Sequence, residues 1–162
     1  MKTMNDAMAQ SIINAARIVL WFTEDLKPDE YLHRPCAKAN CAAWTVGHLI
    51  LAGRMMTSRF AASDLLPLPE GFEAAYARDE QAPSAAKYPH IDGLRELFQQ
   101  THDRLAEAVR KLPAERFDEK LPKPTPMFDT LGGLAAFAPV HIATHAGQIS
   151  TIRRSLGRSP LI

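Results

Sequence analysis

The sequence is poor in the features that define several common functional classes. It has only two cysteines, and its 19 Lys and Arg nearly balance its 18 Asp and Glu. The resulting net charge of +1 argues against electrostatic binding to nucleic acid or to an anionic membrane. The longest apolar run near the N-terminus, residues 18–22, is far too short to cross a bilayer, and no signal-peptide layout is present. We therefore expect a soluble, cytoplasmic protein whose partners are neither nucleic acid nor membrane.

The two cysteines do not form a common metal-binding motif. Cys36 and Cys41 have four residues between them, and no second cysteine pair exists. Together with His33 and His48 they offer a candidate zinc site, but structural zinc sites usually have closer cysteine pairs. Two reduced thiols without a metal are the favoured interpretation.

Four segments have the periodicity of amphipathic helices, and none has convincing strand alternation. Their approximate ranges are 8–26, 42–62, 91–112 and 131–156. Asn40 is the expected N-cap of the second helix, and Asp129 or Thr130 that of the fourth. The stripe expected to face the core includes Trp44, His48, Leu51, Ala52 and Met55 on the second helix, and Leu134, Ala138, His141, His145, Gln148, Ile152 and Leu156 on the fourth. With 162 residues, of which 46% are hydrophobic, the chain is long enough for one all-α domain, a four-helix bundle over residues 1–162.

The connections between the helices constrain how the helices are arranged. Residues 63–90 link the second and third helices and are far longer than an antiparallel pair needs. A link of this length can return along a whole helix, so we expect a crossover between two parallel helices, with its apolar residues lying on the bundle as a lid. The proline-rich segment 121–126 is expected to be an extended connector.

Three of the six histidines occupy unusual places for a polar residue. His141 and His145 are four residues apart on the fourth helix and therefore share one face. His48 interrupts the expected core stripe of the second helix. A divalent metal would satisfy all three imidazoles at once, whereas hydrogen bonding within the core is the simpler alternative. The other three histidines, at positions 33, 90 and 102, are expected to be structural or solvent-facing.

Two segments of the sequence resemble a known family. They are Trp44-Thr45-Val46-Gly47-His48-Leu49 in the second helix and His141-Ile142-Ala143-Thr144-His145-Ala146-Gly147-Gln148-Ile149, with Arg153-Arg154-Ser155-Leu156-Gly157, in the fourth. Both resemble the DinB/YfiT-like superfamily of metalloenzymes. The resemblance implies a four-helix bundle of up-down-down-up topology, in agreement with the crossover. It also implies a metal held by His48, His141 and His145.

The resemblance also suggests a function. Members with assigned activities are mostly transferases or isomerases that use a low-molecular-weight thiol, and a few are hydrolases. We therefore expect a metal-dependent transferase or hydrolase that activates a thiol or water against a small-molecule substrate. Zinc or nickel is the expected ion, with iron or manganese as further candidates, because three histidines select poorly among these metals.

Two questions remain open at this stage. Gln148 lies one turn beyond His145 and either supports the metal site or only forms a hydrogen bond within the bundle. The second question is the function itself. The protein is expected to be a homodimer. The alternative to an enzyme is a non-catalytic, stress-related metal-binding dimer whose site is structural or vestigial.

Overall fold

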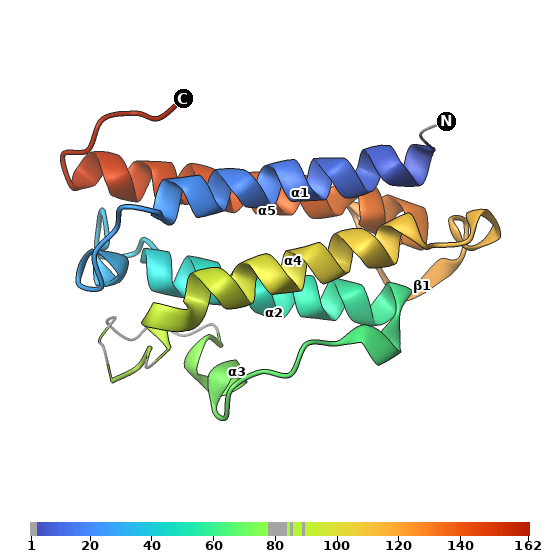
Figure 1. Ribbon diagram of the computed structural model, residues 1–162, viewed down its shortest axis with the longest axis horizontal. Helices are drawn as coiled ribbons and strands as arrows, with labels where there is room; N and C mark the ends of the chain where they lie inside the picture. Colours follow the sequence, from blue (N-terminus) through green and yellow to red (C-terminus); the bar gives the residue numbers. More distant parts are fainter. Residues whose placement is uncertain (1–2, 78–83, 85, 89) are drawn as a thin grey trace.

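The computed structural model describes residues 3–77, 84, 86–88 and 90–162 (Figure 1). Its long helices are α1 (Met4–Thr23), α2 (Ala42–Phe60), α4 (Leu94–Arg110) and α5 (Leu131–Ser155). The shorter elements are the helix α3 (Phe72–Ala75), the strands β1 (Lys120–Thr125) and β2 (Phe128–Thr130), and the 3₁₀ turns η1 (Glu30–Leu32), η2 (Ala62–Asp64), η3 (Ile91–Gly93) and η4 (Ala114–Arg116). The expectation of a mainly helical fold is confirmed.

The four long helices pack side by side. Helix α1 contacts α4 and α5, and α2 contacts the same two helices from the other side. In Figure 1, α2 and α4 run in one direction, whereas α1 and α5 run in the other. The segment between α2 and α4 therefore crosses the length of the molecule, as the long link in the sequence led us to expect.

The helix ends follow local capping chemistry. Thr3 and Asp6 form a capping box at the start of α1, and the Thr130 side chain accepts a hydrogen bond from the Gly133 backbone at the start of α5. The expectation that Asn40 caps α2 is wrong. Cys41 is the N-cap, because its backbone is extended and its Sγ accepts from the Trp44 N–H at 3.5 Å.

The buried faces of α2 and α5 are shifted from the expected stripes. Met55 is 46% exposed, and its neighbour Met56 fills the core at 4%. On α5 the buried face runs through Ala138, Ile142, Ala146, Ile149 and Ile152, so that His141 and His145 lie at its edge and are half-buried. A shift of one residue turns a helix face by about 100°, which moves the histidines from the core to the boundary with solvent.

The crossover is attached to α2 close to His48. The Tyr76 ring lies against Gly47, where a Cβ would meet Tyr76 Cδ1 at 2.0 Å, so only glycine allows this approach. The Trp44 indole N–H donates to the Ala77 carbonyl oxygen at 3.3 Å, and Tyr76 stacks on Tyr88 with 5.2 Å between ring centroids. The expected lid is present over its described part, whereas residues 78–83, 85 and 89 of the segment lie outside the described residues.

A small β-hairpin, which was not predicted from the sequence, joins α4 to α5. The proline-rich connector is extended, as expected, but it pairs antiparallel with β2. The Thr125 hydroxyl oxygen accepts hydrogen bonds from the Met127 and Phe128 backbones, each at 3.2 Å, and so closes the turn. Phe128 of the hairpin then packs on Phe137 of α5 with 4.9 Å between ring centroids.

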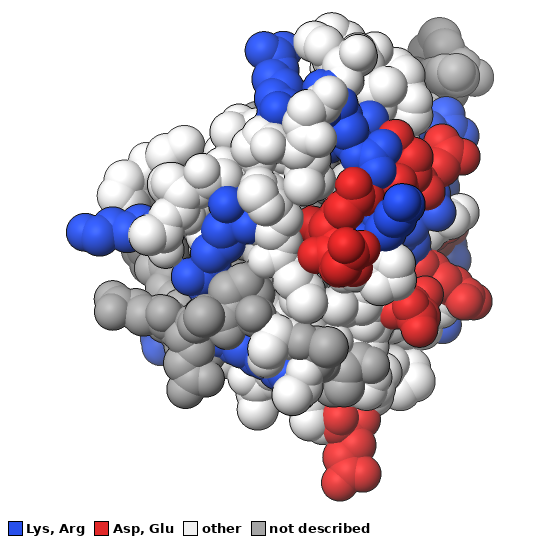
Figure 2. All heavy atoms as spheres, turned by 90° about the vertical axis from the view of Figure 1, so that its left-hand side faces the viewer, with Lys and Arg blue, Asp and Glu red and all other residues white. Residues whose placement is uncertain are grey.

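Ion pairs join the C-terminal ends of α1 and α5. Arg153 is 4% exposed, donates to the Phe22 carbonyl oxygen at 2.9 Å and forms a bidentate pair with Asp25. Arg158 bridges Asp25 and Glu30. The hydrogen bond from Arg153 is the main cause that lowers the pKa of Asp25. Figure 2 views this end of the molecule and shows acidic and basic side chains interleaved over one side of the face.

None of the described helices is both long enough and apolar enough to cross a membrane.

Candidate metal centre

The structure brings the three singled-out histidines together. His48 comes from α2, and His141 and His145 come from successive turns of α5. Each offers one ring nitrogen, and these three nitrogens lie within 4.8 Å of one another. The ring centroids are 4.8 Å apart for both His48–His145 and His141–His145, and 5.4 Å apart for His48–His141.

The spacing of the nitrogens fits a metal ion. His48 Nε2 and His141 Nε2 are 3.4 Å apart. Two imidazole nitrogens bound to one tetrahedral ion at about 2.0–2.1 Å are separated by about 3.3 Å. All three side chains are half-buried, so the cluster is partly shielded from water yet accessible to a ligand. Because all three ligands would be neutral, the full charge of the ion would remain available to a further ligand.

Aromatic rings hold two of the imidazoles in place. Trp44 stacks on His48 with 4.8 Å between centroids and an interplanar angle of 6°. On α5, Phe137 lies 5.9 Å from the His141 ring. Both aromatic residues precede their histidine by four positions, one helical turn. The sequence signal for them was therefore present, although Trp44 was interpreted mainly as a core residue and Phe137 was overlooked.

Gln148 contacts the third histidine. The His145 Nδ1 and the Gln148 Oε1 are 3.0 Å apart. Because an amide oxygen only accepts, Nδ1 carries the proton and the lone pair of His145 lies on Nε2. This contact agrees with both expectations for Gln148, since it is a hydrogen bond within the bundle and also of the kind that commonly orients a ligating histidine.

The surroundings favour neutral imidazoles. Burial, assisted by the neighbouring His145 and His48, lowers the pKa of His141 to about 4. Burial also lowers the pKa of His145, and the hydrogen bond with Gln148 acts in the opposite direction. Neutral imidazole is the form that binds metal, so protons compete weakly for these two residues at neutral pH.

The alternative zinc site is not formed. Within residues 3–77, 84, 86–88 and 90–162, the three histidines are the only group with the spacing of a metal site. Cys36 is exposed and Cys41 is buried, and both are free thiols. His33 pairs with the Ser155 hydroxyl at 2.9 Å, and His102 is 1% exposed inside the core, where its Nδ1 donates to the Phe98 carbonyl oxygen at 2.8 Å.

Two hollows lie along α2 and α5 and begin within one helical turn of a clustered histidine, although none of the three histidines lines either of them. One, of about 370 Å³, begins at Leu51, one turn beyond His48, and lies between α2 and the crossover. The other, which we call the Lys38 hollow, has a volume of about 280 Å³ and is lined by residues of the 35–40 segment and by Gln148 and Thr151.

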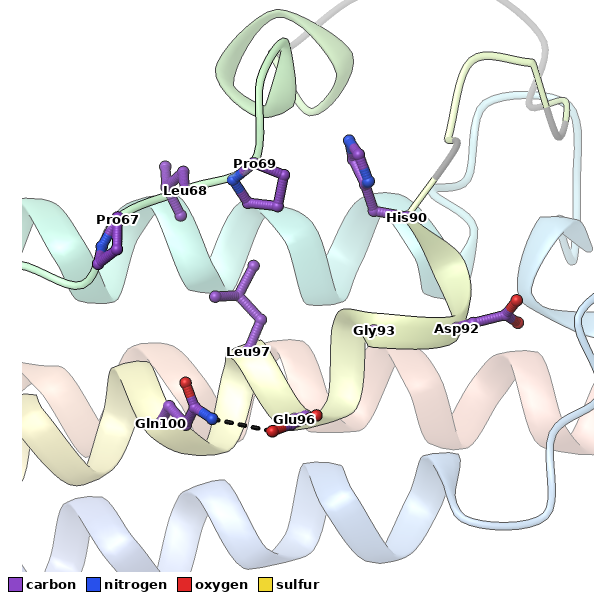
Figure 3. A pocket seen from close by; sticks show the side chains of 9 residues that line it. All are labelled: Pro67, Leu68, Pro69, His90, Asp92, Gly93, Glu96, Leu97 and Gln100. Atoms are coloured by element: carbon purple, nitrogen blue, oxygen red, sulfur yellow. Dashed lines mark hydrogen bonds between the residues drawn. The ribbon is translucent and has the colours of Figure 1, made fainter.

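A larger groove lies away from the histidines. It has a volume of about 570 Å³ and lies between residues 67–69 of the crossover and the N-terminal part of α4. Figure 3 shows Leu68, Pro69 and Leu97 facing one another across it, and Gln100 hydrogen-bonded to Glu96 along α4. His90 lines it, but, as in the two smaller hollows, none of the three clustered histidines does.

A mainly helical chain with three histidines converging from two helices has the construction of a helical metal-binding protein. Comparison with family models gives a match to the DinB superfamily over residues 13–149, and the chain therefore belongs to this superfamily, which is metal-binding. The resemblance noted in the sequence is thereby confirmed. Searches of curated proteins and of solved structures gave no match.

Proposed function

We propose that this protein is a metal-dependent enzyme of the thiol S-transferase or hydrolase type, acting on a small molecule. His48, His141 and His145 would hold a divalent ion, with zinc or nickel favoured over iron or manganese. The observation that carries the proposal is the convergence of three half-buried imidazoles whose nitrogens lie within 4.8 Å of one another. A structural zinc site would instead have four protein ligands and no open position.

The proposed fold is the up-down-down-up four-helix bundle, formed by a single domain over residues 1–162. The directions of α1, α2, α4 and α5 in Figure 1 and their mutual contacts support this topology. In it, α2 and α5 are antiparallel neighbours, which lets residues 93 positions apart in the chain face one another at the site.

The side chains around the cluster have separate roles in the proposed chemistry. When bound, the ion would supply Lewis-acid chemistry that lowers the pKa of a water molecule or a thiol. Trp44 and Phe137 hold the imidazoles of His48 and His141, and Gln148 keeps the proton of His145 on Nδ1. Among the described residues, the cluster contains histidines alone, without an Asp or Glu.

Metal content measured by elemental analysis tests the site first. Protein without a histidine tag should contain about one ion per chain, and His48→Ala and His145→Ala should each lose it while remaining folded by circular dichroism. A wild type that holds no ion and refuses added zinc, nickel, iron and manganese would contradict the proposal.

A turnover screen tests the catalytic part. Metal-loaded protein should convert at least one electrophile or ester in the presence of water or of one of several low-molecular-weight thiols, and the same variants should abolish turnover. Full metal occupancy with a raised melting temperature and no turnover would instead support the non-catalytic, stress-related metal-binding protein.

We also propose that the protein is a cytoplasmic homodimer. Its described surface includes large exposed apolar side chains on three of the long helices, Met4, Trp21, Met55 and Val140, which a second copy could cover. Light scattering should give twice the mass of the 17.9 kDa chain, and a concentration-independent monomer mass would contradict this.

A further inference from the structure

The Lys38 hollow adjoins the histidine cluster through Gln148. Gln148 lines the hollow and also contacts His145. Along α5, Gln148 and Thr151 lie about 4.5 and 9 Å beyond His145, since each residue of a helix rises 1.5 Å. A ligand of a few bonds could therefore have one end at the histidines and the other in the hollow.

The polar groups around the hollow are mainly hydrogen-bond donors. The Gln148 Oε1 is occupied by His145 Nδ1, so its amide nitrogen keeps two N–H groups for another partner. Thr151 already donates its only hydroxyl proton to the Gly147 carbonyl oxygen at 3.2 Å, so it offers the hollow an acceptor, and the donors come from the other side chains. Lys38 contributes an ammonium group and Asn40 an amide, and no Asp or Glu lines the hollow.

The charge of Lys38 is not neutralised by the part of the chain that the structure describes. No ion pair of Lys38 occurs there, whereas Arg153 and Arg158 at the same end of the molecule are paired with Asp25 and Glu30. A hollow with one cation, amide donors and no acid is complementary to a group that accepts several hydrogen bonds and carries a negative charge.

We propose that the Lys38 hollow binds a carboxylate of a small-molecule ligand whose other end reaches the three histidines. This inference rests on the proposed function, because the far end of the ligand needs the metal. It narrows the substrate class to thiols or electrophiles that carry a carboxylate a few bonds from the reacting atom.

Binding of three matched thiols to the Co²⁺-loaded protein tests this inference. The probes are 3-mercaptopropionate, its uncharged amide and cysteamine, which is cationic, and thiolate–Co²⁺ charge-transfer absorption reports binding without turnover. We expect 3-mercaptopropionate to bind about tenfold more tightly than cysteamine and the amide to lie between them.

Charge reversal at Lys38 provides the decisive comparison. Lys38→Glu should reverse the order, so that cysteamine binds more tightly than 3-mercaptopropionate, a result that misfolding would not produce. Lys123→Glu makes the same change in net charge on the exposed strand β1 and should keep the wild-type order.

The outcomes separate this inference from the proposed function. Failure to take up Co²⁺ would contradict the metal site and this inference with it. Uptake of Co²⁺ with equal affinities for the three thiols, or with none binding, would contradict only the carboxylate inference. If Lys38→Glu and Lys123→Glu changed the thiol affinities equally, the preference for the carboxylate would come from the overall charge of the protein. That result would also contradict the carboxylate inference.

Discussion

The indole of Trp44 lies close to clustered histidines from both α2 and α5. It lies parallel to the His48 imidazole, is 6.5 Å from the His145 ring, and donates its N–H to the Ala77 carbonyl oxygen of the crossover. At 7% exposure the side chain is also part of the core. Trp44 can therefore belong to the core and also contact the candidate site. The fluorescence of its indole should change when the neighbouring histidines bind an ion.

Metal binding should quench the fluorescence of Trp44. Titration with Co²⁺, Ni²⁺ or Cu²⁺ should lower the emission in a saturable manner, because a paramagnetic ion at the histidines would lie within a few ångströms of the stacked indole. Trp44→Phe should lose the saturable change and Trp21→Phe should keep it, since Trp21 is exposed on α1. If Trp44→Phe kept the full saturable fall in fluorescence, the ion would bind away from the three clustered histidines.

Gln148 should tune the affinity for metal without being a ligand. Gln148→Leu removes the oxygen that accepts from His145 Nδ1, and metal affinity should fall by about tenfold, the usual effect of losing such a partner. Competition with a chromophoric chelator measures this loss. The matched control is Gln99→Leu, at an exposed position on α4, and equal affinities in the two variants would remove Gln148 from the site.

At the scale of the elements, the attachment of the crossover to α2 depends on a glycine. Tyr76 lies directly on Gly47, one residue before His48, and is 1% exposed. The crossover and the ligating helix are therefore coupled next to the metal centre. A change at this contact should disturb the crossover, and through it the hollow between the crossover and α2.

Two glycine-to-alanine variants test this coupling. Gly47→Ala should lower the free energy of unfolding by about 2 kcal/mol because the new methyl group overlaps the Tyr76 ring. Gly147→Ala, where no atom lies within 4 Å, should raise it by about 0.5–1 kcal/mol through helix propensity. Urea unfolding measures both values, and equal stabilities would contradict the contact.

The helices could be predicted from sequence more completely than their connections. Hydrophobic periodicity is a local property, so the four long helices were found with errors only at their ends. The β1–β2 pairing was missed because Pro122 and Pro124 interrupt any alternating pattern and the partner strand has only three residues. The cap of α2 was misplaced by one residue because cysteine is not a usual capping residue.

The candidate site was predictable only in part. The four-residue spacing of His141 and His145 can be recognised from the sequence alone. The position of His48 relative to them, however, depends on how α2 and α5 pack. The interruption of the expected core stripe of α2 by His48 suggested that third member, and the family resemblance supported it. The half-burial of the three histidines could not be predicted from the apolar stripes of the helices. A buried face that is shifted by one residue places the same histidine at the boundary with solvent instead of in the core.

At the scale of the whole molecule, a buried histidine links stability to pH. His102 of α4 is buried in the protein core, and this burial lowers its pKa to about 4 from an ordinary 6.5. Between these values the unfolded chain binds a proton that the folded protein excludes. The stabilisation is therefore complete above pH 6.5 and is lost as the pH falls toward 4.

The metal-free protein should show this dependence in denaturant unfolding. The free energy of unfolding should fall by up to about 3 kcal/mol between pH 7 and pH 4 through His102 alone, with His141 adding to the fall. His102→Gln should be less stable at pH 7 but should show a shallower decline. Parallel curves for the two proteins would assign the pH dependence to other groups.

The separation of the histidines along the chain has a consequence for biosynthesis. His48 precedes the other two by more than ninety positions, and α5 is made after α2. The nascent chain therefore presents only one of the three clustered imidazoles until α5 is made, and the three cannot bind one ion before α5 has docked on α2. A metal that needs all three histidines could therefore be bound only after α2 and α5 have packed together.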